Sequence, residues 1–255
     1  MPFQKITAEK LSNSVVRQVE LLILRGILRP GERLPSERDL ADRLGVSRPS
    51  LREAIGQLQE TGLLASKAGA GLYVADVLGA AFSPALIRLF STHEEAIFDY
   101  IAFRRDMEGL AAERAATMAS DTDLAVIDTI FQKMNTPSAR RTPEDEARLD
   151  AEFHLSIIEA SHNTIMLHMM RSMFEMLQGG VFYNRQIMFK QRTTRDTLLD
   201  QHRRINAALQ DRDPVEARAA LEDHLTFVET SMAMHARAEH NEAIARQRFE
   251  HEQNR

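Results

Sequence analysis

One stretch, from Pro35 to Val74, constrains the fold more than any other part of the 255-residue chain. It reads PSERDLADRLGVSRPSLREAIGQLQETGLLASKAGAGLYV. Ser36 is a favourable N-cap for a short helix, and Gly45 is the residue type that often ends a helix in the left-handed conformation. Ser47 can cap a second helix, with Pro49 in its first turn, where a missing N–H costs nothing. The pattern predicts two helices joined by a tight turn.

The residues after this turn extend the pattern. Leu51, Ile55 and Leu58 recur at helical spacing and predict the buried face of the second helix. Beyond it, the short runs 63–67 and 72–74 flank the segment AGAG, which predicts a β-hairpin with a glycine-rich tip. Helix, turn, helix and hairpin in this order predict a winged helix-turn-helix.

Polar side chains gather at the start of the second predicted helix. Arg48, Ser50 and Arg52 lie on or beside its exposed face. A helix with this arrangement can enter the DNA major groove, where arginine pairs bidentately with guanine. Lys67, in the hairpin, is placed for a phosphate or minor-groove contact. The alternative is a small helical hairpin with a solvated arginine face, but the combined order of cap, turn glycine, arginines and wing favours DNA binding.

The segments RPG, LPSER and LGVSRPSLREA resemble the winged-helix domain of the GntR family of bacterial transcription regulators. The rest of the chain resembles the all-helical ligand-binding domain, called FCD, of the FadR subfamily. The resemblance implies DNA contacts at Arg38, Ser47, Arg48, Ser50, Arg52 and Gly69.

The charge distribution agrees with a DNA-binding N-terminal part. The net charge is −5, but residues 1–75 hold eleven Lys and Arg against eight Asp and Glu, a balance of +3. The remainder therefore carries −8 and would be repelled by phosphates. The chain has no cysteine, no signal-like N-terminus and no apolar run approaching about 18 residues, so we expect a cytoplasmic protein without membrane contact.

Four regions are expected along the chain. Residues 1–76 form the winged helix-turn-helix, with a first helix near 7–27, and residues 77–82 form a linker. Residues 83–237 form an all-α helical bundle that binds effector and metal, and residues 238–255 form a charged tail. Helical periodicity places the helices of the bundle near 84–91, 94–119, 122–134, 143–161, 163–191, 194–210 and 214–237.

Four residues of this second domain form a candidate metal site. Asp150 and His154 are four residues apart, so they share one face of a helix. His202 and His224 lie on two later helices among apolar neighbours, so both imidazoles are expected to face inward. In a helical bundle these four side chains can converge on a divalent ion. A single histidine on such a face is more often a hydrogen-bonded core or boundary residue than a metal ligand, and the D-x-x-x-H spacing also occurs by chance.

The spacing of these four residues resembles the metal-binding subset of FadR-type ligand domains. The chain departs at Asp150 and His154 from the pyruvate-sensing member of the subfamily, which it resembles over its whole length and which lacks both ligands. Nitrogen and oxygen donors without thiolate suit Zn²⁺, with Ni²⁺ or Mn²⁺ as alternatives. In the family this ion helps to hold a small carboxylate effector.

Two further residues are candidate effector contacts. Arg105 and Glu108 match an R-x-x-E pattern of the family, and arginine suits bidentate recognition of a carboxylate. The alternative for this pair is a surface ion pair of little energetic value. Asn184 follows the diglycine at 179–180 and could line the same pocket.

Together these features predict an effector-controlled transcription regulator. We expect a repressor that binds double-stranded operator DNA with palindromic sequence as a homodimer. Its effector would be a small carboxylate such as pyruvate, lactate or glycolate, which follows from the resemblance. A metal-responsive regulator of the same fold is the alternative. A metalloenzyme is a distant one, because the sequence has none of the common catalytic motifs.

Overall fold

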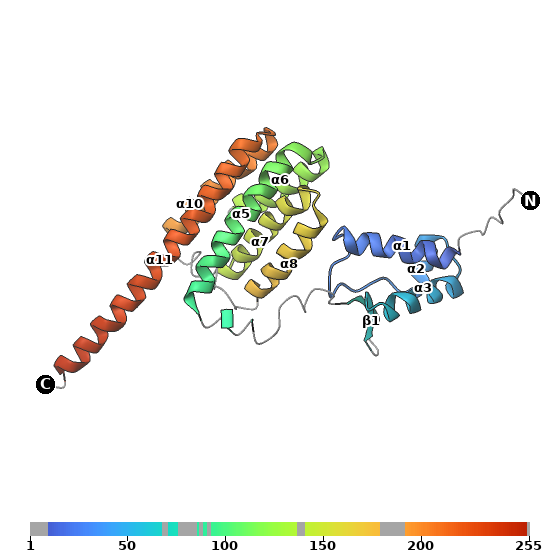
Figure 1. Ribbon diagram of the computed structural model, residues 1–255, viewed down its shortest axis with the longest axis horizontal. Helices are drawn as coiled ribbons and strands as arrows, with labels where there is room; N and C mark the ends of the chain where they lie inside the picture. Colours follow the sequence, from blue (N-terminus) through green and yellow to red (C-terminus); the bar gives the residue numbers. More distant parts are fainter. Residues whose placement is uncertain are drawn as a thin grey trace, which may run out of the picture. The chain divides into compact units, whose positions relative to one another are not determined.

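The computed structural model describes residues 10–67, 71–75, 86, 89–90, 93–136, 141–178 and 192–253. The chain divides into two compact units, Met1–Phe82 and Ser83–Arg255, and each is described by itself. In their described parts, the first unit combines helices with one hairpin and the second is all-helical (Figure 1). This confirms the expected fold class. The predicted linker 77–82 lies outside the described residues, and the domain bounds remain predictions.

The first unit is a winged helix-turn-helix. Its elements are α1 (Leu11–Leu24), α2 (Glu37–Leu44), α3 (Arg48–Glu60), β1 (Leu64–Lys67) and β2 (Gly71–Val74). The two strands are antiparallel, with Leu64 opposite Val74 and Lys67 opposite Gly71.

The local signals in the sequence define the ends of α2 and α3. Ser36 accepts a hydrogen bond from the backbone N–H of Asp39 at 3.2 Å, which caps α2. Gly45 has φ 65° and ends that helix in the left-handed conformation. Ser47 then caps α3 by accepting from the N–H of Ser50 at 3.3 Å. The turn between the helices is therefore fixed by three small residues.

The core of the first unit lies between α1, α3 and the hairpin. Its largest contributions come from Val15, Val19, Ile23, Leu51, Ala54, Leu58, Leu64 and Val74, all of which are buried. Packing of Leu51 and Leu58 into this core leaves the opposite face of α3 exposed.

The second unit is a helical bundle. Its helices are α5 (Glu94–Met118), α6 (Asp121–Asn135), α7 (Pro143–Ala160), α8 (Thr164–Gln178), α10 (Arg192–Gln210) and α11 (Pro214–Gln253). Helix α11 has 40 residues and continues through 238–253, where the sequence predicts a charged tail. The helix predicted over 84–91 lies mostly outside the described residues, as does the second half of the one predicted over 163–191. Among the described helices, none is both long and apolar enough to cross a membrane.

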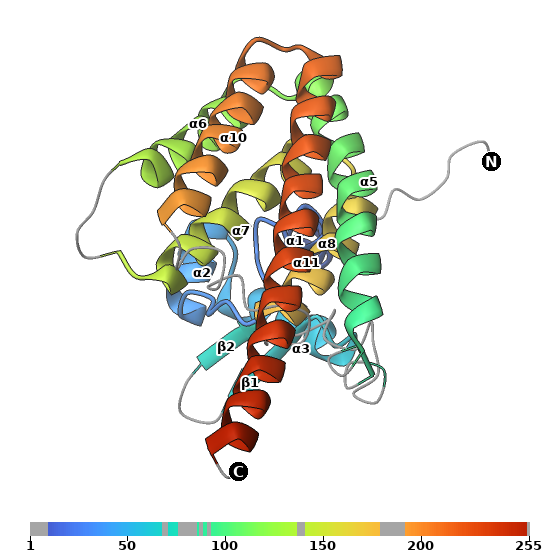
Figure 2. The same ribbon diagram turned by 90° about the vertical axis from the view of Figure 1, so that its left-hand side faces the viewer.

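Helix α5 packs side by side with the first part of α11, which continues beyond it (Figure 2). Their contact is made of small residues: Ala112, Ala115 and Ala116 of α5, and Ala217 and Ala220 of α11, are fully or almost fully buried. A Cβ added at Gly109 would lie 3.0 Å from Cγ of Glu222, which shows how closely the helices approach. This close packing brings polar residues of α5 next to α11 and α7.

Reciprocal side-chain caps set the starts of α6 and α7. Ser120 and Asp123 form a capping box at α6, and Thr142 and Asp145 form one at α7. Pro143 occupies the first position of α7, as the sequence predicts. The start of α7 fixes which of its faces carries Asp150 and His154 into the bundle.

Candidate metal centre and nucleic-acid interface

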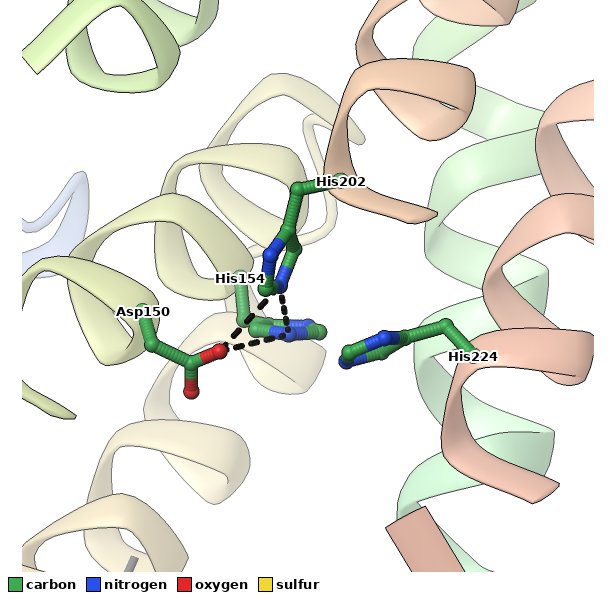
Figure 3. Close-up of side chains that lie close together, drawn as sticks. All are labelled: Asp150, His154, His202 and His224. Carbon is green, nitrogen blue, oxygen red and sulfur yellow. Dashed lines mark hydrogen bonds and ion pairs between the residues drawn. The ribbon is translucent and has the colours of Figure 1, made fainter. Parts of the chain in front are cut away.

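Asp150, His154, His202 and His224 converge in the interior of the second unit (Figure 3). Each offers one ligand atom, and these atoms all lie within 4.8 Å of one another. The four residues are buried and come from α7, α10 and α11. The sequence predicted this convergence from the helical spacing and the apolar neighbours.

The contacts within the cluster show which ring atoms face it. Nε2 of His202 lies 3.1 Å from Oδ1 of Asp150 and 3.4 Å from Nε2 of His154. The rings of His202 and His224 are 4.5 Å apart between centroids. Phe153 packs edge-on against His202 at 5.2 Å and restricts its orientation. The Nε2 atoms of His154 and His202 therefore face a common point.

Burial favours the neutral, metal-binding form of His154 and His224. It lowers the pKa of His154, although Glu108 acts in the opposite direction. It lowers the pKa of His224 well below the ordinary value, and the neighbouring His202 and His154 lower it further. Neutral imidazole is the metal ligand, so these residues need not lose a proton near neutral pH before they bind an ion.

Two of the three histidines have a partner on the far side of the ring. Nδ1 of His154 lies 2.5 Å from Oε2 of Glu108, and Nδ1 of His224 lies 3.0 Å from Oε1 of Gln201. Metal-binding histidines usually donate this second N–H to a carboxylate or carbonyl, which fixes tautomer and orientation. The donor set, its burial and these outer contacts fit a divalent metal ion.

Glu108 connects the cluster to a buried arginine. Nε of Arg104 donates to Oε1 of Glu108 at 2.6 Å, and both side chains are at most 5% exposed. Burial alone would raise the pKa of Glu108, but Arg104 and His154 together lower it to about 2. Nη2 of Arg104 is buried and has no hydrogen-bond partner among the described residues. A buried, unpaired donor beside the cluster is what a ligand carboxylate would satisfy.

Arg105 does not form the ion pair with Glu108 that was the alternative to an effector contact, and its role as an effector contact remains a prediction. Nη1 of Arg105 donates instead to Oε2 of Glu229 on α11 at 2.7 Å, in a pair that is about 30% exposed. Arg104 is four residues before Glu108 and shares its inward face, together with Tyr100. The sequence signal that distinguishes the two arginines is this i,i+4 spacing to Glu108 on the apolar face.

The predicted DNA contacts lie on the surface of the first unit where the structure describes them. Arg38, Ser47, Arg48 and Arg52 are exposed and Ser50 is half-buried. Nε of Arg52 donates to Oε2 of Glu37 on α2 at 2.8 Å, so α2 orients this arginine.

Three other predicted site residues are not tested. Lys67 is the last residue of β1, but its side chain lies outside the described part. Gly69 and Asn184 lie wholly outside the described residues. Their roles remain predictions.

Comparisons with known proteins match both units. Residues 11–74 match the family model described as bacterial regulatory proteins of the gntR family, and residues 99–227 match the FCD domain. The Glc operon transcriptional activator of Escherichia coli K12 is 32% identical over 221 residues, which cover 86% of this chain and 87% of that protein. The putative L-lactate dehydrogenase operon regulatory protein of the same strain is 34% identical over 253 residues, which cover 93% and 96%.

A solved structure shows the same fold. Streptococcus agalactiae GntR has a TM-score of 0.50 and 23% identity, over 86% of this chain and 99% of that one. The fold, the buried cluster of Asp150 and three histidines, and these relatives all indicate the same family. The chain therefore belongs to the gntR family of bacterial regulatory proteins with an FCD domain, and it is a DNA-binding transcription regulator rather than an enzyme.

Proposed function

We propose that this regulator is a repressor whose operator affinity is controlled by a small carboxylate held at a divalent metal in the second unit. The observation that supports the proposal most directly is the buried chain of contacts from Asp150 and His154 through Glu108 to Arg104. This chain joins the candidate metal ligands to an arginine whose Nη2 has no hydrogen-bond partner among the described residues.

Asp150, His154, His202 and His224 would hold the ion. Three imidazoles and one carboxylate suit Zn²⁺, and Ni²⁺ or Mn²⁺ are alternatives with the same donor types. When bound, the ion supplies a positive charge to which an organic anion can bind at a remaining coordination position.

Arg104, rather than Arg105, is the arginine that we assign to the effector. It is 4% exposed, whereas Arg105 is tied to Glu229 near the surface. A buried guanidinium is stabilised by an anion far more than an exposed one, because water no longer screens the attraction. Asn184 remains a predicted additional contact.

The relatives guide the choice among effectors. They are named for the Glc operon and an L-lactate dehydrogenase operon, which favours 2-hydroxy acids such as glycolate and lactate. Pyruvate is the weaker candidate, because the pyruvate-sensing member of the subfamily lacks two of the metal ligands. A 2-hydroxy acid can offer its hydroxyl and carboxylate oxygens to the ion together.

The first unit would read a palindromic operator as part of a homodimer. Each α3 would enter one major groove, with Arg48 and Arg52 at its N-terminal end. The effector can change DNA affinity only by binding the DNA-competent and DNA-incompetent arrangements differently. DNA binding would place the protein in the cytoplasm.

The test uses the full chain and an operator selected in vitro, with DNA binding followed by fluorescence anisotropy. Glycolate and L-lactate are expected to release DNA from the Zn²⁺-loaded protein and to lose this effect after chelation. Arg104→Gln is expected to abolish the response, and Arg105→Gln is the matched control that retains it. Effector-driven release that is unchanged by chelation or by Arg104→Gln would contradict the proposal.

A metal-responsive regulator is the second candidate, because four protein ligands can bind an ion without any effector. In that case operator binding would follow the free Zn²⁺ or Ni²⁺ concentration in the absence of carboxylate. Metal that stays bound while DNA affinity responds to glycolate would exclude this reading.

A further inference from the structure

A pocket of the second unit is lined in part by His202. It lies between the end of α6 and the starts of α7 and α10, and encloses about 370 Å³ including its open mouth. Met134, Leu149, Leu198 and Leu199 form its apolar lining, and His202 reaches it from the metal cluster. Arg104, which we assign to the effector, does not line this pocket.

The charged groups of the pocket favour one anion. Arg141, Arg195 and Glu146 line it, which leaves one net positive charge. Arg195 donates from Nη2 to Oε1 of Glu146 at 2.5 Å, and Glu146 is only 9% exposed. Arg141 donates to the carbonyl oxygens of Lys133 and Met134 at the end of α6, which fixes its guanidinium at the pocket. A single carboxylate would balance the remaining charge.

His202 presents an unsatisfied donor in this part of the molecule. Its Nε2 faces Asp150 and His154, whereas its Nδ1 is buried and has no hydrogen-bond partner among the described residues. In Figure 3 this nitrogen lies on the edge of the ring that is turned away from His224. When Nε2 binds a metal, Nδ1 carries the proton and must donate it.

The other two histidines of the cluster each have a hydrogen-bond acceptor for Nδ1. Glu108 accepts from Nδ1 of His154, and Gln201 accepts from Nδ1 of His224. Such outer partners are worth roughly 10–100-fold in metal affinity. His202 has no such group from the described protein, and of the three histidines it is the one that lines this pocket.

We propose that this pocket binds a short aliphatic carboxylate whose oxygens accept hydrogen bonds from Arg195 and from Nδ1–H of His202. Its hydrocarbon part contacts Leu149, Leu198 and Leu199. The bound acid then accepts the Nδ1–H of His202, as Glu108 accepts that of His154, and thereby strengthens metal binding. This inference rests on the proposed metal site, and linkage requires that the metal strengthens binding of the acid by the same factor.

The test measures Zn²⁺ affinity of the full chain by competition with a chromophoric chelator, with and without butyrate. Butyrate is expected to tighten Zn²⁺ binding about tenfold, and acetate, which lacks most of the hydrocarbon, to act only at higher concentration. Arg195→Gln is expected to remove the enhancement. Glu146→Gln is expected to increase it, because the competing carboxylate is gone. Opposite effects of two neighbouring substitutions are not explained by loss of folding.

Two controls separate the pocket from the effector site. Arg148→Gln removes an exposed arginine of α7 that pairs only with Asp145 and Glu152 in the described structure, and should leave the enhancement intact. The second control is Arg105→Gln, which removes the partly exposed arginine next to Arg104 and should also leave the enhancement intact. In ¹⁵N-histidine spectra of the Zn²⁺-loaded protein, butyrate is expected to shift the Nδ1–H signal of His202.

The outcomes distinguish this inference from the proposed function. An enhancement that Arg104→Gln abolishes and Arg195→Gln leaves intact would overturn the pocket and support only the effector site. Zn²⁺ binding without any butyrate effect would also overturn it and would point to water as the partner of His202. If inorganic phosphate tightened Zn²⁺ binding as much as butyrate does, the assignment of an aliphatic acid to the pocket would be overturned. Failure of the wild-type chain to bind Zn²⁺ would refute the proposed metal site itself.

Discussion

The two units hold their candidate functional groups in opposite ways. On the first unit, Arg48 and Arg52 lie on the solvent side of α3, and the side chain of Arg52 is 71% exposed. In the second unit, Arg104, Glu108 and His154 are at most 4% exposed. Exposed charges cost little to hold, whereas buried ones need partners. Binding and stability should therefore be separable in the first unit and inseparable in the second.

The buried charges in the interior of the second unit do not balance, and a bound metal ion would supply the missing positive charge. Two carboxyl groups, of Asp150 and Glu108, face one guanidinium, that of Arg104, and burial lowers the pKa of His154 and of His224. A divalent cation supplies the missing positive charge. The polar interior thus stabilises the folded chain most when the ion is present.

The largest expected effect follows from substituting Glu108, which contacts both Arg104 and the metal-cluster residue His154. Glu108→Gln leaves Arg104 buried without its counter-charge and weakens the contact to His154. We expect the second unit to lose about 3–5 kcal/mol of stability. Glu113→Gln on the same helix is the control, because Glu113 forms an exposed pair with Arg218 and should cost less than about 1 kcal/mol. Equal losses in denaturant titrations would contradict the contrast between buried and exposed charges.

Metal binding should stabilise the second unit alone. At a free Zn²⁺ concentration of 100 times Kd, the expected gain is about 2.7 kcal/mol. Calorimetry of the full chain should show one transition that rises with Zn²⁺ and falls with chelator, and one that does not respond. Asp150→Asn should lose the response. A transition of the first unit that moves equally would break the division between the units.

The first unit offers the reverse case, in which binding changes and stability does not. Arg48→Gln is expected to weaken operator binding by about 1–3 kcal/mol, roughly 5- to 150-fold, because an arginine at the front of α3 can contact a base. Its melting temperature should stay within the error of wild type. Arg25→Gln removes the same charge from the exposed end of α1 and should affect specific binding much less. A clear loss of stability in Arg48→Gln would show that the exposed face has a structural role.

Much of the fold could be predicted because its signals are local. Ser36, Gly45 and Ser47 act on the few residues next to them, so the ends of α2 and α3 follow from sequence. The convergence of Asp150 and His154 follows from their i,i+4 spacing on one helix. Their meeting with His202 and His224 required only that each histidine face the apolar interior.

The features that could not be predicted depend on how helices face one another. Arg104 and Arg105 are adjacent, so their directions differ by about 100° around α5. The i,i+4 spacing indicates that Arg104 and Glu108 share a face, but the packing of α5 against α7 and α11 is what buries that face. The pocket beside His202 combines Arg141 and Glu146, near the start of α7, with Arg195 of α10 and Met134 at the end of α6. No spacing rule relates residues that meet only after three helices have packed.

The smallest expected effect tests whether the contrast concerns charge alone. Helix caps are exposed in both units: Ser36 caps α2 and Ser120 caps α6, each accepting a backbone N–H at 3.2 Å. Ser36→Ala and Ser120→Ala should therefore each cost about 1 kcal/mol in denaturant titrations of the unit concerned. Ser120→Ala keeps the second half of its capping box, in which Asp123 accepts the N–H of residue 120, so its cost should not exceed that of Ser36→Ala by much. If the cap of the second unit proved several times more costly, local structure as well as buried charge would separate the two units.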